Sequence, residues 1–449
     1  MLLIRIIILF LCTLSLFAEE EGFINDPGPA SETVKEAQDE QVSSLPADVT
    51  LTLEEAEQMF LKNNLSLLTA RYNIDVKKAL IIQAGLYPNP NVFFEQNAYN
   101  PKTFRYFDFT PHGSTVVQIQ QLFLLGGKLS KRVQVARLNA ELSEYEFYDL
   151  MRSLKYELRR NYFAVHYNKQ LLTFYDHSLD ALRLTVTFAE KAYEQRAMLL
   201  HEVLRLKTLL LQLEKEKVEV YTELKEAEAT LRVLLNDPRT KTANLHTKID
   251  DLLLDRVSVD ALSKDKALNV ALEYRPDLKK AIQNIKLGLA QVELQKAYSY
   301  PDVAVGPVFN RANTYIPQYT GFTASISVPL FDRNEGNIEA AEKDVVARRA
   351  DLEKLHVEIT HEIEIIHRRM VEKDKIYGTF KNTFTRDYAR LADLMVENYK
   401  KRYITIIEFA DFFESYRTSM QNMIQLQIER IEAIESMNHA MGYTFLRIQ

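Results

Sequence analysis

The sequence predicts a mainly α-helical fold with a small β part, in which one series of elements occurs twice along 449 residues. Residues 128–237 contain neither glycine nor proline, and a second tract from Asn337 onward is interrupted only by Gly378 before Gly442. Both tracts have apolar residues at helical spacing and are far longer than an ordinary globular helix. A stretch of alternating apolar and polar residues precedes each tract, which indicates β-strands.

The first residues predict a secretory signal peptide at residues 1–18. The segment MLLIRIIILFLCTLSLFA has one arginine, an apolar run and the small residue Ala18 at its end. This run is too short for a mature membrane-spanning helix, and a buried N-terminal helix is the alternative. Cys12 is the only cysteine and lies within this segment. The mature chain is therefore expected to need no disulfide and no thiolate metal site.

Residues 19–49 are acidic and contain several Pro and Ser residues, so we expect a flexible acidic leader. The next segment predicts a helix that begins after Thr52, with Glu55 three residues later to complete a capping box. The helical pattern continues to Gly85.

Between residues 91 and 123 the period changes from that of a helix to that of a strand. Val117 and Ile119 lie on one face of the segment STVVQIQQLF, and Gln118 and Gln120 lie on the other. Together with the preceding segment NVFFEQ, this pattern predicts a hairpin with a long aromatic connection.

After a looser connection at residues 238–267, the same order of elements returns. A helical segment ends at Pro301, and the segments DVAVGPVF and FTASISVPLF then alternate as strands do. Pro301 follows Pro90 by 211 residues, and Leu278 follows Leu67 by the same number. The sequence therefore predicts an internal duplication, with a first repeat at residues 50–237 and a second at residues 268–449.

A further pair of stretches supports this duplication. The segments AYEQRAMLLHEVL (192–204) and NYKKRYITIIEFA (398–410) both read Tyr-x-x-Arg, then five residues, then Glu and an apolar residue, 206 residues apart. A helix as long as either tract cannot bury its apolar stripe alone, so each tract is expected to fold back on itself. The repeated stretches are the candidate turns.

The alternation in the strands is typical of a transmembrane barrel wall, with apolar side chains toward lipid and polar side chains toward water. Four strands cannot close a barrel, and open strand edges are not tolerated in hydrocarbon. Three copies are therefore expected to form a twelve-stranded barrel, and a small soluble sheet that caps a helical bundle is the alternative. Seven aromatic residues suit an interfacial girdle and outer loops: Tyr99, Phe104, Tyr106, Phe107, Phe109, Tyr315 and Tyr319.

Two motifs resemble outer-membrane efflux proteins of the TolC type. These are RPDL (275–278) at a helix start and VPLFDRNEGNIEAAE (328–342) after the last strand; PLFDRNEGN is similar to the heavy-metal-efflux, CzcC-like subgroup. The resemblance covers residues 50–445 and implies a trimer whose barrel continues into a periplasmic α-helical barrel. It also implies three kinds of partner: a periplasmic adaptor, an inner-membrane pump of the resistance-nodulation-division type, and outer-membrane lipid.

The resemblance assigns roles to residues of this sequence. Glu408 and Asp411 would line the constricted end of the channel, and a solvated acidic helix face is the alternative. Arg196 and Arg402 stand where the family usually has glycine. Two further sets complete the assignment: the periplasmic tip and adaptor docking site, Tyr193, Arg196, Glu202, Tyr399 and Arg402; and the strand-to-helix turns, Gly126, Gly127, Pro329, Phe331, Asp332 and Gly336.

Several other functions find no support in the sequence. The net charge of −6 provides no overall basic surface for nucleic acid. In HEIEIIH (361–367) the histidines are not four residues apart, as a metalloprotease helix requires, and GGKLS (126–130) lacks the rest of a phosphate-binding loop. No enzyme or cofactor motif stands out.

The sequence therefore predicts the passive outer-membrane exit channel of a tripartite efflux system, with metal cations favoured by the motif PLFDRNEGN. Drug efflux or type I protein secretion through the same kind of channel is one alternative. A soluble periplasmic coiled-coil structural protein is an alternative of a different class.

Overall fold

The computed structural model describes residues 48–240, 243–249, 259–311, 316–384 and 387–445. The predicted signal peptide at residues 1–18, residues 19–47 of the predicted leader, and Tyr315 lie outside these ranges. The sequence places the end of the leader at residue 49, whereas strand β1 (Asp48–Thr52) already begins at Asp48.

Helices α2 (Leu53–Asn63) and α3 (Leu65–Ala84) form the first helical segment. The predicted capping box is confirmed: Glu55 N–H donates to Thr52 Oγ1 at 3.2 Å, and Thr52 N–H donates to Glu55 Oε2 at 2.8 Å. Asn64 separates the two helices and caps α3, since its Oδ1 accepts the Leu67 N–H at 3.0 Å.

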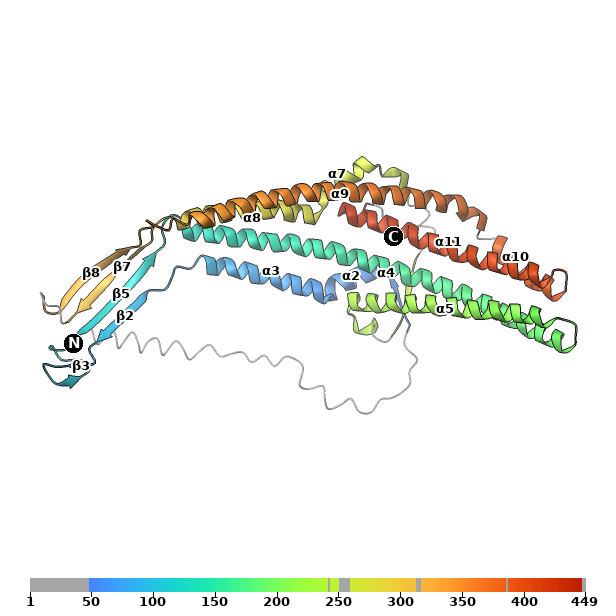
Figure 1. Cartoon of the computed structure of the whole chain (residues 1–449), viewed down its shortest axis with the longest axis horizontal. Coiled ribbons are helices and arrows are strands. Elements are labelled where there is room, and N and C mark those ends of the chain that lie inside the picture. Colours follow the sequence, from blue (N-terminus) through green and yellow to red (C-terminus); the bar gives the residue numbers. More distant parts are fainter. Residues whose placement is uncertain (1–47, 241–242, 250–258, 312–315, 385–386, 446–449) are drawn as a thin grey trace. The chain divides into compact units, whose positions relative to one another are not determined.

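The four predicted strands form one antiparallel sheet in the order β2-β5-β7-β8 (Figure 1). Their bounds are β2 (Asn91–Gln96), β5 (Thr115–Phe123), β7 (Val303–Asn310) and β8 (Tyr319–Ile326). The predicted hairpin of β2 and β5 is confirmed, and β7 and β8 form a second one. The β5–β7 pairing joins the two hairpins into a continuous sheet. The long aromatic connection contains a small hairpin of β3 (Tyr99–Asn100) and β4 (Arg105–Tyr106).

Both long tracts fold back at the repeated stretches, as predicted. The first tract divides into α4 (Lys128–Glu194) and α5 (Leu200–Leu235). The second comprises α9 (Glu335–Phe384), α10 (Asp387–Lys400) and α11 (Ile406–Met441). Helix α4 has 67 residues and is therefore about 100 Å long. It packs against α3, α5, α8 (Pro276–Tyr298) and α11, as Figure 1 shows.

The connection at residues 238–267 is more ordered than the sequence predicts. It contains β6 (Asn244–Lys248), which pairs in parallel with β1, and helix α7 (Lys264–Tyr274) begins before its predicted end. Two short 3₁₀ turns complete it, Pro238–Thr240 and Val259–Ala261. Tyr162 of α4 ties this small sheet to the helices, because its hydroxyl donates to Leu51 O at 2.9 Å or Lys248 O at 2.8 Å.

The core runs along the helices and includes large aromatic side chains. Tyr162, Tyr167 and Tyr175 of α4 are fully buried. Burial is limited near the sheet, where many apolar side chains are exposed. No helix in the described ranges is both long and apolar enough to span a membrane.

Candidate functional site

The first repeated stretch forms a tight helix-ending turn between α4 and α5. Arg196 adopts a left-handed conformation with φ of 55°. Its N–H donates to Tyr193 O at 2.9 Å, and the N–H of Ala197 donates to Ala192 O at 2.8 Å. These two bonds are those of a Schellman motif, in which glycine usually occupies the left-handed position.

The second stretch repeats this geometry 206 residues later, between α10 and α11. Arg402 has φ of 59°, and its N–H donates to Tyr399 O at 3.0 Å. The N–H of Tyr403 donates to Asn398 O at 2.9 Å. Arginine thus takes the place of glycine in both turns without changing the pattern of hydrogen bonds.

The glutamate of each stretch caps the helix that follows the turn. Glu202 Oε2 accepts the Leu199 N–H at 2.9 Å. In the second stretch, Glu408 Oε2 accepts hydrogen bonds from the Thr405 N–H at 2.7 Å and from the Thr405 hydroxyl at 2.9 Å. The backbone N–H of Thr405 is the main cause that holds the pKa of Glu408 below its ordinary value. Sequence reasoning missed this role, although Thr405-x-x-Glu408 is the sequence pattern of a capping box.

Within a single chain, the carboxylates of the predicted pair, Glu408 and Asp411, make different contacts. The Glu408 carboxylate turns back toward Thr405, whereas Asp411 Oδ1 of α11 lies 3.1 Å from Arg205 Nη2 of α5. All three side chains are exposed, so the ion pair between α5 and α11 is accessible to water.

The two tip tyrosines differ in their surroundings. Tyr193 is 44% exposed, whereas Tyr399 is 5% exposed and stacks on Phe409 with ring centroids 4.8 Å apart. Phe413 continues this stack at 5.8 Å from Phe409. Burial raises the pKa of Tyr399 to about 12. Of the two tyrosines predicted to dock an adaptor, Tyr193 therefore presents more of its ring to solvent.

The first strand-to-helix turn contains two glycines in the left-handed conformation. Gly126 and Gly127 have φ of 68° and 70°, and Gly127 immediately precedes α4. A Cβ on Gly126 would lie 2.9 Å from Tyr300 Cβ, so no side chain fits there. Next to this turn, Lys128 Nζ lies 2.7 Å from Asp302 Oδ1, just before β7.

In the second strand-to-helix turn, the left-handed residue is Asn334 with φ of 63°, whereas Gly336 lies within the first turn of α9. Asn334 Nδ2 donates to Gln295 O at 2.8 Å, and Asp332 Oδ1 accepts the Asn334 N–H at 2.9 Å. The expected role of Gly336 in the turn is thus taken by Asn334, which tolerates this conformation better than most residues. Pro329 and Phe331 lie in the irregular segment before it, and the Phe331 side chain is fully exposed.

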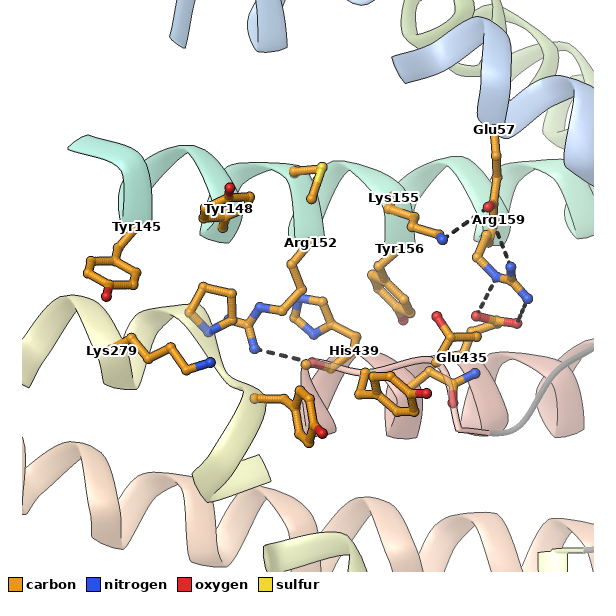
Figure 2. A pocket seen from close by; sticks show the side chains of 17 residues that line it. Glu57, Tyr145, Tyr148, Arg152, Lys155, Tyr156, Arg159, Lys279, Glu435 and His439 are labelled. Atoms are coloured by element: carbon orange, nitrogen blue, oxygen red, sulfur yellow. Dashed lines mark hydrogen bonds and ion pairs between the residues drawn. The ribbon is translucent and has the colours of Figure 1, made fainter. Parts of the chain in front are cut away.

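A cavity of about 770 Å³ lies where α11 ends and α8 begins beside α4 (Figure 2). Its charged side chains are largely paired: Arg159 Nε and Nη1 lie 2.7 Å and 2.6 Å from Glu435 and Glu57. Burial lowers the pKa of His439 to about 4, so this histidine is neutral at pH 7. In the described part of the chain, no cluster of three or more His, Cys, Asp or Glu is arranged to hold a metal.

Comparisons with known proteins identify the family of this chain. Residues 56–237 and 267–364, together more than half of the chain, match the model of the outer membrane efflux protein family. The cobalt-zinc-cadmium resistance protein CzcC of Cupriavidus metallidurans is 22% identical over 293 residues, which are 65% of this chain and 66% of that protein.

Solved structures share the fold. A membrane protein from Pseudomonas aeruginosa has a TM-score of 0.70 at 15% identity, covering 87% of this chain and 90% of its own. The outer membrane channel MtrE of Neisseria gonorrhoeae, solved in its open state, has a TM-score of 0.68 at 16% identity over 88% of this chain and 90% of its own. The chain belongs to the outer membrane efflux protein family, whose members are outer-membrane channels with a large helical part in the periplasm.

Proposed function

We propose that three copies of this chain form the exit channel of a tripartite efflux system. Its partners would be a periplasmic adaptor and an inner-membrane pump of the resistance-nodulation-division type. The channel is passive, because the pump supplies the energy. The family match carries this proposal, and the likeness to MtrE, an outer membrane channel, supports it.

The sheet supports a barrel that three chains share. Its outer strands, β2 and β8, each have one unpaired edge within the described chain. Val92 and Phe94 of β2, and Phe322 and Ile326 of β8, are more than half exposed, as lipid-facing residues would be in an isolated chain. On the opposite face, Gln118 Nε2 donates to Thr323 Oγ1 at 3.0 Å. Joining β8 of one copy to β2 of the next would close a twelve-stranded barrel with no open edge.

Helix α3 supports the trimer independently of the sheet. Five large apolar side chains at helical spacing are 44% to 61% exposed: Leu65, Leu68, Tyr72, Val76 and Leu80. Such a stripe is normally covered by another element. A neighbouring copy would cover it as the helices close into a periplasmic α-helical barrel.

The paired contacts support an internal duplication. Asn64 Nδ2 donates to Leu234 O at 3.0 Å, and Arg275 Nη1 donates to Ala440 O at 2.9 Å. The donors are 211 residues apart and the acceptors 206 residues apart, as the repeated sequence motifs are. A trimer of duplicated chains would present six similar hairpins to its periplasmic partners.

We assign the constriction to Glu408 and Asp411, and adaptor docking to the turns around Tyr193, Arg196, Glu202, Tyr399 and Arg402. Six carboxylates around one axis favour cations over anions. This preference, the motif PLFDRNEGN and the likeness to CzcC all support metal cations as the substrate.

Two measurements test this function. The purified trimer is expected to conduct ions across a planar bilayer, and cells without the chain are expected to become sensitive to cobalt, zinc or cadmium. Sensitivity to dyes and drugs alone would favour drug efflux, and loss of a secreted protein would favour type I secretion. Recovery of the chain in the soluble periplasmic fraction would contradict the channel and favour the soluble coiled-coil alternative.

A further inference from the structure

The connection between β2 and β5, residues 97–114, is organised around one buried carboxylate. Asp108 is only 2% exposed. Its carboxylate accepts hydrogen bonds from Asn100 Nδ2 at 2.9 Å, Thr103 Oγ1 at 2.6 Å and Thr110 Oγ1 at 2.6 Å. The carboxylate is thus satisfied within the connection and holds its two halves together.

Around this centre, the aromatic side chains point outward. Phe104 and Phe107 have φ of 55° and 45°, a region that large side chains rarely occupy. Such strain persists only where the surrounding contacts impose it, and it is concentrated at functional positions. The strained backbone at these two positions thus accompanies a set of exposed rings. Their exposed fractions are 43% to 79%: Tyr99, Phe104, Tyr106, Phe107 and Phe109.

Two cations lie among these rings. Lys102 and Arg105 are exposed. Neither side chain has an ion-pair partner among the residues that the structure describes. Because the carboxylate of Asp108 faces inward, the outer surface combines large rings with unpaired positive charge.

The position of the connection indicates what covers it. It lies at the end of β5 opposite to α4, next to the exposed apolar residues Val92 and Phe94 of β2. In the proposed membrane position, those residues contact acyl chains, so the connection lies at the level of the lipid headgroups. Aromatic rings are favoured at this level, and Lys and Arg bind phosphate oxygens there.

We propose that residues 97–114 form a preformed contact surface for phosphate-bearing lipid headgroups. Phe104, Tyr106 and Phe107 lie at the acyl boundary, while Lys102 and Arg105 bind lipid phosphates. This inference rests on the proposed outer-membrane position and adds a lipid-binding role that the channel function alone does not require.

The absence of tryptophan from the sequence provides a direct test. Phe104→Trp in the full chain introduces a single tryptophan, and Tyr403→Trp, at a residue that is 76% exposed beside the Arg402 turn, provides the control. In phosphatidylcholine vesicles with brominated acyl chains, we expect quenching of the Phe104→Trp variant to exceed that of the control by about twofold, because interfacial rings reach the acyl boundary. Tyr106→Trp replaces the first variant if that variant does not fold.

Two outcomes would overturn the proposal. Strong quenching by acrylamide without quenching by bromine would place the ring in water. Blue-shifted emission that neither agent quenches would place the ring against another copy of the chain. If the channel conducts normally in either case, only this inference fails; a chain that does not insert at all contradicts the proposed function instead.

The cations require a second comparison in the Phe104→Trp background. Anionic phosphatidylglycerol in the vesicles is expected to increase bromine quenching, and Lys102→Gln with Arg105→Gln is expected to abolish the increase. The control is Lys354→Gln with Arg368→Gln, which removes the same charge from exposed positions of α9. An increase that survives the loss of Lys102 and Arg105 would contradict their assignment to phosphate.

Discussion

Arg196 and Arg402 hold a backbone conformation in which a β-carbon costs about 1–2 kcal/mol. Both complete a Schellman motif that glycine would complete without this strain. Both side chains are exposed, so core packing does not explain the arginines. Their charge at the two turns is consistent with contact to a partner, which fits the proposed adaptor docking.

Replacing Arg196 by glycine is therefore expected to stabilise the first turn by about 0.5–1 kcal/mol, because glycine adopts positive φ without penalty. The measurement is the thermal midpoint of the purified protein, with Ala197→Gly as the control, since Ala197 does not have positive φ. The control is expected to lower the midpoint. A fall of similar size for Arg196→Gly would show that strain does not govern this turn.

The cap at Glu408 predicts a pH dependence at the start of α11. The pKa of Glu408 is lowered in the folded chain, so its stabilising contribution is present above the ordinary value of 4.5 and is lost as the pH falls through the lowered pKa. Hydrogen exchange of the Thr405 amide is expected to become less protected over that range. Glu408→Gln is the control, and an unchanged pH profile in that variant would rule out the carboxylate as the cause.

At the scale of elements, buried ion pairs join α4 to its neighbours. Arg159 lies between Glu435 of α11 and Glu57 of α2, and all three groups are largely buried. The next residue, Arg160, pairs with Glu432 at the surface. The two adjacent arginines thus provide a matched comparison of a buried and an exposed ion pair.

Arg159→Gln is expected to destabilise the protein by about 3–5 kcal/mol, because two carboxylates lose their buried partner. Arg160→Gln is expected to cost less than about 1 kcal/mol, because water already solvates its pair. Chemical unfolding of both variants measures the difference. Equal losses would show that burial does not set the strength of these contacts.

The helices, the four strands and both turns could be predicted from sequence because each has a local pattern. The alternation of apolar and polar residues identifies the strands, the capping box at Thr52 identifies a helix start, and the repeated Tyr-x-x-Arg motif marks the turns. The pairing of β1 with β6 could not be predicted, because these five-residue strands pair residues that are 196 positions apart and carry no local signal.

Residue roles at the turns were harder to predict than the turns themselves. The pattern places Tyr193 and Tyr399 as equivalents, yet only tertiary packing against Phe409 buries the second. Similarly, Asn334 takes the left-handed position near Gly336 because its amide reaches Gln295 of α8, a contact that spacing does not show.

At the scale of the whole molecule, the ion pair of Arg205 and Asp411 joins α5 to α11 near the proposed constriction. Arg205 partly neutralises the carboxylates that would line the channel. The ion pair of Arg205 with Asp411 should therefore affect both the net charge of the opening and the packing of α5 against α11.

Removing the positive charge and removing the negative charges at the opening are expected to change ion selectivity in opposite directions. Arg205→Gln is expected to raise the cation preference of the channel in planar bilayers, whereas Glu408→Gln with Asp411→Asn is expected to lower it, because each changes the charge at the opening. Both changes are also expected to raise conductance if the ion pair holds the two hairpins together. Unchanged selectivity in both variants would contradict the assignment of the constriction.

The unpaired edges of β2 and β8 have a kinetic consequence. In the proposed trimer, no chain can complete its sheet alone, so the last step of folding is also an encounter between molecules. The rate of trimer assembly should then depend on the concentration of unassembled chains. At low concentration, each chain would remain longer as a monomer with exposed strand edges. Expression level, rather than sequence alone, would decide how many chains reach the membrane intact.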